Sequence, residues 1–304
     1  MKKFYFLMLC LLTLSVSAIA QTVKSVSSPD GNIKVDVRIG NGITYDVYCG
    51  EEKVLADCRM SMDIEGNVLG SLPKLQSVKR QKVNDVKRPF LKLKFAEVPN
   101  NYNEMTLVMK GNYSVVFRAY NDGLAYRFVT SLKGEVKVNH EDITVFFPQD
   151  AQLVLQQSDR YRTSYEERYS FVKSSEWLSF QKMAHYPVLA ITSGGTKILM
   201  SESDLCDYPA PFFRSNDANG FSSVFPRVPA VEKPRSDKSN DVLLRHPYIA
   251  KTQGTRSFPW RYFVIAKDEA ALVTNTMTCR LAQDSKLQDV SWIVPGQASW
   301  EWWN

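Results

Sequence analysis

Residues 33–49 read IKVDVRIGNGITYDVYC, and this stretch decides the fold class of the chain. Apolar and polar residues alternate on both sides of Gly40-Asn41-Gly42. A period of two residues places every second side chain on one face of a β-strand. Glycine and asparagine between two such runs are typical of the tight turn of a hairpin. The stretch therefore predicts two antiparallel strands, 33–39 and 43–49, that share one buried face.

The same alternation recurs along the chain, with short turns rich in glycine and asparagine between the runs. It predicts further strands at 105–109, 113–120, 124–130, 136–138, 143–147, 153–155, 188–192 and 197–201. Helical periodicity is scarce: one helix is expected at 268–276 behind an Asp268 cap, and the proline-rich residues 209–240 are expected to form long surface loops. Many short strands predict an all-β fold, a large antiparallel β-sandwich with few short helices, with a barrel as the alternative.

The first residues have the parts of a secretory signal peptide. Lys2 and Lys3 precede an apolar run at 4–16 and the small-residue pattern Ala18-Ile19-Ala20. The apolar run is shorter than the about 20 residues that a membrane span needs. The sequence therefore predicts a signal peptide at 1–20, an exported periplasmic or extracellular protein, and no membrane association after cleavage.

Charge and cysteine usage argue against two classes of function. The formal net charge is +6, part of it from the leader lysines, and the densest basic stretch, 79–94, lacks interleaved aromatic stacking residues, so no nucleic-acid partner is expected. The cysteines form no CxxC pair and no cluster with histidine, so a zinc site is not expected. Cys49 and Cys58, the nearest pair after the leader, form either a disulfide or two buried thiols.

Standard catalytic motifs are absent, because the chain has no GxSxG, HExxH, phosphate-binding glycine loop or EF-hand. The most informative polar stretch is YRTSYEERY at 161–169, where tyrosines recur every fourth residue beside Glu166 and Glu167. Aromatic rings and carboxylates are typical of a sugar site. A carboxylate can also bind a hard cation such as Ca²⁺, which takes about six to eight oxygen ligands. The alternative is a solvated loop whose ion pairs contribute little to stability.

The last five residues, Trp300-Glu301-Trp302-Trp303-Asn304, hold half of the 6 tryptophans. Large aromatic side chains are unusual at a chain end, which is normally polar and loosely packed. Val294-Pro295-Gly296 predicts a turn, and a strand is expected to start after it. We therefore expect the chain to be the front part of a larger protein.

Four motifs, taken in order, resemble glycoside hydrolase family 97. They are YNDGLAYRF at 120–128, YExxY at 165–169, FPWR at 258–261 and PGxxxWEWWN at 295–304. Each motif alone is weak, but the four in this order behind a signal peptide are specific. The resemblance runs from SSPDG at 27–31 to the last residue.

The resemblance implies a galactose-mutarotase-like β-sandwich (a supersandwich) at 21–293, with 294–304 as the first residues of a (β/α)₈ catalytic barrel that this chain lacks. Family members hydrolyse α-glucosides or α-galactosides and hold Ca²⁺ in the active site. The family's sandwich supplies one glutamate to that ion, which maps onto Glu166, with Glu167 as the fallback. Trp302 and Trp303 are expected to contact the substrate.

No catalytic residue is assigned to this chain, because the family's acid and its base or nucleophile belong to the barrel. The sandwich is thus expected to be inactive alone and to pack against a barrel encoded elsewhere or lost. Ca²⁺ and an α-linked oligosaccharide are the expected cofactor and substrate of the complete enzyme only. Two other hypotheses remain: a stand-alone carbohydrate-binding module, and an interaction domain that docks through Trp302 and Trp303.

Overall fold

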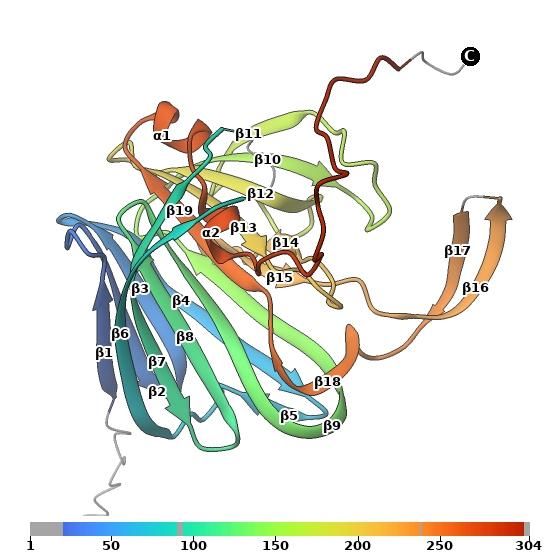
Figure 1. The fold of residues 1–304 in the computed structure, drawn as a ribbon. Helices are drawn as coiled ribbons and strands as arrows, with labels where there is room; N and C mark the ends of the chain where they lie inside the picture. Colours follow the sequence, from blue (N-terminus) through green and yellow to red (C-terminus); the bar gives the residue numbers. More distant parts are fainter. Residues whose placement is uncertain (1–20, 90–93, 238, 301–304) are drawn as a thin grey trace, which may run out of the picture.

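The computed structural model describes residues 21–300 except 90–93 and 238, and this part of the chain contains 19 strands and two short helices. The strands pair antiparallel and form two curved layers that face each other (Figure 1). This arrangement confirms the predicted all-β class and the large antiparallel sandwich. No helix among the described residues is both long and apolar enough to span a bilayer.

The two layers are built from strands that lie far apart in the sequence. One layer contains β6 (Leu75–Lys87), β7 (Val98–Met109), β8 (Tyr113–Tyr120), the first part of β9 (Gly123–Phe146), β19 (Trp260–Ala266) and β13 (Lys197–Ser203). The other contains β1 (Thr22–Ser27), β2 (Ile33–Gly40), β3 (Gly42–Cys49), β4 (Glu52–Ile64), the last part of β9, β15 (Gly220–Val224) and β14 (Phe212–Ser215). The short β5 (Asn67–Leu69) pairs with β4, and β18 (Ala250–Ser257) pairs with the middle of β9.

Two strands join the layers. The 24-residue β9 pairs with β8 and β19 near its start and with β4 and β15 near its end. On the opposite side, β12 (Met183–Ile191) pairs with both β13 and β14. Along its other edge β12 pairs with β10 (Gln152–Ser158), and β10 pairs in turn with β11 (Tyr169–Lys173). The layers are therefore held together by backbone hydrogen bonds as well as by the core between them.

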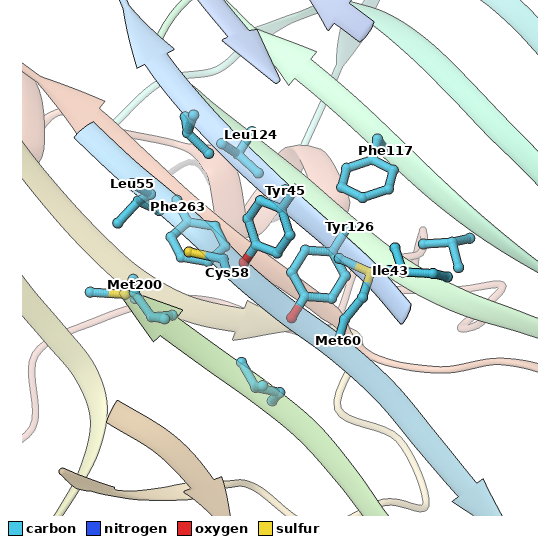
Figure 2. Close-up of a cluster of buried hydrophobic side chains, with 14 of the residues drawn as sticks. Ile43, Tyr45, Leu55, Cys58, Met60, Phe117, Leu124, Tyr126, Met200 and Phe263 are labelled. Carbon is cyan, nitrogen blue, oxygen red and sulfur yellow. The ribbon is translucent and has the colours of Figure 1, made fainter. Parts of the chain in front are cut away.

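Aromatic side chains fill the space between the layers (Figure 2). Tyr45 on β3 is fully buried, and its ring centroid lies 6.1 Å from Phe117, 5.7 Å from Tyr126 and 6.4 Å from Phe263. Tilted and edge-on contacts of this kind stabilise a core beyond the burial of their area. The predicted hairpin is confirmed, with Ile39 opposite Ile43 across its turn.

Of two further predictions, one is confirmed and one is wrong. The helix expected at 268–276 is confirmed as α1 (Glu269–Val273), and the Asp268 carboxylate caps it by accepting from the Ala271 amide at 2.8 Å. The prediction of long loops across 209–240 is wrong, because this stretch contains β14, β15 and β16 (Pro229–Ser236). Proline is compatible with the first residue of a strand, as at the start of β16. It is also compatible with an edge strand, because its lack of a backbone N–H need not remove a hydrogen bond from the ladder there.

The alternatives for the nearest cysteine pair are settled, because Cys49 and Cys58 are both free and buried. The Cys58 sulfur lies 3.5 Å from the Phe146 amide, which donates to it across the β4–β9 junction. Burial raises the pKa of the Cys58 thiol to about 12, so it packs as a small neutral side chain.

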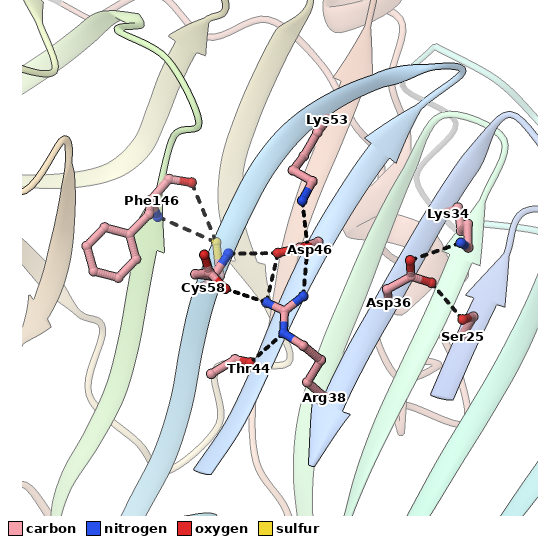
Figure 3. A network of polar contacts seen from close by, with 10 residues as sticks. Ser25, Lys34, Asp36, Arg38, Thr44, Asp46, Lys53, Cys58 and Phe146 are labelled. Atoms are coloured by element: carbon pink, nitrogen blue, oxygen red, sulfur yellow. Dashed lines mark hydrogen bonds and ion pairs between the residues drawn. The ribbon is translucent and has the colours of Figure 1, made fainter. Parts of the chain in front are cut away.

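A charged network covers the outer face of the β2–β3 hairpin (Figure 3). The side chain of Asp46 is 6% exposed and accepts from Arg38 at 2.7 and 2.9 Å and from Lys53 at 2.9 Å. It also accepts from the Asp57 amide at 2.8 Å. Burial raises the pKa of Asp46, but the hydrogen bonds from Arg38, Asp57 and Lys53 outweigh burial and hold it well below its usual range.

Replacing Asp46 with asparagine is expected to lower the free energy of unfolding by about 1–3 kcal/mol at pH 7. A depressed carboxyl pKa stabilises the fold above the unfolded value of about 3.9 and loses this contribution as the pH falls towards the folded value. Urea unfolding should therefore show stability falling between about pH 5 and pH 2 in the parent and falling less steeply in Asp46→Asn. Asp36→Asn, on the same hairpin but with an exposed lysine partner, is the control. Equal pH slopes in all three chains would contradict the assignment.

Candidate functional site

The tyrosine-rich segment 161–169 forms the connection between β10 and β11 and is not helical. Tyr161 packs edge-on against Phe212 with centroids 5.1 Å apart. Tyr165 lies edge-on to His185 at 4.6 Å and adopts a positive φ of 59°. Two of the three regularly spaced tyrosine rings therefore pack against the strands beneath the loop and hold it in place.

Glu167 holds this loop in place. One of its carboxylate oxygens accepts from the Thr163 hydroxyl, and the other lies 3.7 Å from Nε2 of buried His185 on β12. The Gln156 side chain donates to the Glu167 carbonyl at 2.9 Å. The Thr163 hydrogen bond, with a smaller contribution from His185, lowers the pKa of Glu167. A threonine four residues before an acid was the local signal for this role, but the histidine contact has no signal in the sequence.

Glu166 has the opposite environment. It is exposed, and within the described part of the chain its side chain has no hydrogen-bond or ion-pair partner. Because Glu167 is turned inwards, the loop presents Glu166 outwards as an ionisable group with all of its acceptor sites available. The two adjacent acids that the sequence could not distinguish thus differ in the contacts they make.

A carboxylate in this position fits one place in the coordination shell of a hard cation, but not a whole site. Ca²⁺ takes about six to eight oxygen ligands. Among the described residues, no group of three or more histidine, cysteine, aspartate or glutamate side chains could hold a metal ion. Any ion that Glu166 binds therefore needs oxygen ligands other than a cluster of such side chains, for example carbonyl oxygens or water.

An open, polar pocket of about 620 Å³ lies beside the loop. Four of its lining residues are basic: Arg160, Arg162, Lys182 and Arg235. Arg162 lies 3.3 Å from Asp241 on β17 (Ser239–Arg245), so an ion pair connects the loop with the hairpin β16–β17. The loop and the hairpin that this ion pair connects lie 79 positions apart in the sequence.

The motifs YNDGLAYRF and FPWR meet in the interior. They lie on the paired strands β9 and β19, where Arg261 is opposite Tyr126. The Arg261 guanidinium donates to both oxygens of buried Glu141, at 3.0 and 2.7 Å, and also to Glu202. Burial raises the pKa of Glu202. Neither glutamate was singled out from the sequence, because each lies far from Arg261 along the chain.

The same motifs also build the outer face of this layer. Two guanidinium groups lie over the Trp260 ring, that of Arg118 at 4.6 Å and that of Arg127 at 4.1 Å from the ring centroid. A neighbouring apolar cluster is covered by α2 (Met277–Leu281), whose Met277 and Leu281 are buried. The described contacts of both motifs are therefore packing and ion-pair contacts within the fold.

The remaining predicted positions fall where the structure says nothing. Trp302 and Trp303, the expected substrate contacts, lie outside the described residues, and so does the predicted signal peptide at 1–20.

Comparison with known proteins places these features in a family. The sequence model of the family described as "Glycosyl-hydrolase 97 N-terminal" matches residues 26–283. A retaining alpha-galactosidase of Bacteroides thetaiotaomicron is 34% identical, covering 100% of this chain and 47% of that protein. A probable retaining alpha-galactosidase of Streptomyces bingchenggensis is 26% identical, covering 91% of this chain and 40% of that protein. The chain thus spans about half the length of these curated relatives.

Solved structures share the fold. A glycoside hydrolase family 97 enzyme from Pseudoalteromonas sp. strain K8, in complex with acarbose, superposes with a TM-score of 0.73 at 21% identity, covering 90% of this chain and 40% of that one. A beta-arabinopyranosidase superposes with a TM-score of 0.68 at 19% identity, over 80% of this chain and 40% of that one. These likenesses show the fold, and the family match over residues 26–283 shows that the chain belongs to the glycosyl-hydrolase 97 N-terminal family.

Proposed function

We propose that this chain is the non-catalytic sandwich half of an exported α-galactosidase and that it supplies Glu166 as one calcium ligand of the complete active site. The observation that carries the proposal is the division of roles in the loop 161–169. Glu167 accepts from Thr163 and lies 3.7 Å from buried His185, whereas Glu166 is exposed and has no partner among the described residues. A ligand that completes an ion shared with another domain needs this combination of a rigid backbone and an uncommitted carboxylate.

The substrate class rests on the relatives. Both curated relatives are named as α-galactosidases, one of them as probable, and both as retaining. Retaining glycoside hydrolysis needs two carboxyl groups about 5–5.5 Å apart across the scissile bond. We assign neither of them to this chain, so a second domain supplies both. Export is supported by the leader pattern at 1–20.

Within such an enzyme, the chain's own residues bind and orient. The pairing of β10 with β11 and β12 fixes both ends of the loop, and the Tyr165 ring against His185 fixes its middle. When bound, a calcium ion supplies positive charge that stabilises developing negative charge on a reacting oxygen. The role of Glu166 is to hold that ion at the edge of the sandwich.

The proposal is tested in a chimera that joins this chain to the second half of the Bacteroides thetaiotaomicron relative. Glu166→Gln is expected to raise the Ca²⁺ concentration for half-maximal α-galactosidase activity by about 10–100-fold. Glu176→Gln, an exposed glutamate just beyond β11, should leave that concentration unchanged.

The isolated chain should not turn over aryl α-galactosides with or without Ca²⁺. Turnover by the isolated chain, or equal calcium dependence in both variants of the chimera, would contradict the proposal.

A further inference from the structure

The hairpin formed by β16 and β17 is separate from the sandwich. It forms a two-stranded sheet of its own and projects from the body at the right of Figure 1. All eight residues of β16 are exposed. An isolated two-stranded hairpin is at best marginally stable in water. The arm therefore gains stability from any partner that adds strands to it.

The free edge of β17 offers such a place. Among the described strands β17 pairs only with β16, so the backbone groups along its other edge have no strand partner. Unpaired edges are templates for added strands. Apolar side chains lie along this arm in the open: Leu243 is 63% exposed, Leu244 59% and Val231 46%. Natural edge strands are usually protected by lysine, proline or a covering loop, and β17 has no lysine or proline.

The sequence of β17 is complementary to itself when reversed. Residues 241–245 read DVLLR, with an acid at one end, a base at the other and three apolar residues between them. In an antiparallel pair centred on Leu243, Asp241 lies opposite Arg245 of a second copy, and Val242 lies opposite Leu244. We propose that β17 pairs with β17 of a second copy of this chain across a two-fold axis, forming a four-stranded sheet from two arms.

Both faces of the resulting sheet are matched. Side chains two residues apart share a face of a strand, so Asp241, Leu243 and Arg245 lie on one face. There the two leucines meet at the axis between two ion pairs. Val242 and Leu244 lie on the other face, where Val231 of β16 is already opposite Leu244. The charges and the exposed apolar side chains thus agree in a single register, as an isologous contact requires.

The association is expected to be weak. Two narrow arms bury less area than a stable dimer needs, and interfaces of this size are transient. In the single chain Asp241 already lies 3.3 Å from Arg162 and 3.8 Å from Arg235. Pairing with Arg245 of the second copy therefore replaces these ion pairs in part, and the net gain in charge attraction is small. A dissociation constant on the order of 100 µM is expected.

Sedimentation equilibrium of residues 21–304 between about 5 and 500 µM tests the proposal. Asp241→Arg and Arg245→Asp should each weaken dimerisation about tenfold, because each places like charges opposite each other at two symmetric positions. The double variant Asp241→Arg/Arg245→Asp should restore the parent affinity to within about threefold, since both cross-strand pairs are re-formed with reversed sign. A purely structural role of either residue in the arm would give no such recovery.

Leu243→Lys removes the central apolar contact and should abolish the dimer. Leu287→Lys, an equally simple change at a leucine that is 56% exposed outside the arm, should leave it intact. A parent chain that stays monomeric over the whole concentration range overturns the proposal and leaves the arm to another occupant, such as the second half that the curated relatives carry. A dimer that survives Leu243→Lys overturns it as well.

Discussion

An Arg261→Met chain is expected to lose about 3–5 kcal/mol of its free energy of unfolding at pH 7. The Arg261 side chain is 1% exposed and that of Glu141 3% exposed, so this pair is out of contact with water. Burial lowers the pKa of Arg261, but the interaction with Glu141 raises it by more, so the guanidinium stays charged. Removing it leaves Glu141 and Glu202 buried without their cation, which costs more than the ion pair itself contributes.

Urea unfolding followed by circular dichroism measures this effect, with Lys251→Met as the matched control. Lys251 also pairs with a glutamate, Glu135, at 2.7 Å, but both side chains are about half exposed. The control should change stability by less than about 1 kcal/mol. Adding Glu141→Leu to Arg261→Met should recover part of the loss, because only Glu202 then remains unpaired. Similar losses in Arg261→Met and Lys251→Met would contradict the buried-pair argument.

The parts of the fold that the sequence predicted are those where one face of a strand is buried. β2 and β3 show the period of two because alternate residues meet the core, from Ile33 to Cys49. β16 has no such face, since all of its residues are exposed, and its alternation carries no signal. Proline then suggested a loop where the chain forms an edge strand. The helix at 268–276 was predictable because an N-cap is a local contact, Asp268 to Ala271.

The candidate site was predictable in composition and not in geometry. Two adjacent acids marked the loop, but their different roles depend on His185, which reaches Glu167 from another strand. The pairing of Arg261 with Glu141 spans 120 positions of sequence, and no spacing rule relates the two. The link from Arg162 to Asp241 depends on the hairpin that the sequence had assigned to loops. Contacts between residues close in sequence can thus be predicted from the sequence, whereas contacts between distant strands become visible only in the structure.

Gly123→Ala is expected to cost about 3 kcal/mol or more, the second of the two largest effects. Gly123 opens β9 opposite Val264 of β19. A methyl group there would lie 2.2 Å from the Phe263 carbonyl oxygen and 2.6 Å from the Met277 methyl carbon. The methionine can rotate away, but the carbonyl belongs to a paired strand and cannot move without separating β9 from β19.

Two variants isolate the backbone clash as the cause. Gly134→Ala lies on the same strand with a φ of +67° and open space around it, so it should show only the strain of a left-handed residue, about 1–2 kcal/mol. Gly123→Ala/Met277→Ala removes the flexible contact and should not restore stability to Gly123→Ala. Recovery in the double variant would show that the methionine, not the carbonyl, causes the loss.

The damage at Gly123 should reach the interior network, because the same strand pair sets Arg261 opposite Tyr126. If β9 and β19 separate at Gly123, the Arg261 guanidinium on β19 loses its alignment with Glu141 on β9. Hydrogen exchange should therefore accelerate at the β19 amides of Gly123→Ala before it accelerates in the β2–β3 hairpin. Unchanged exchange in β19 and an unchanged urea midpoint would contradict this prediction. The glycine of YNDGLAYRF is thus required by the close approach of two backbones, which positions the arginine of FPWR for its buried partner.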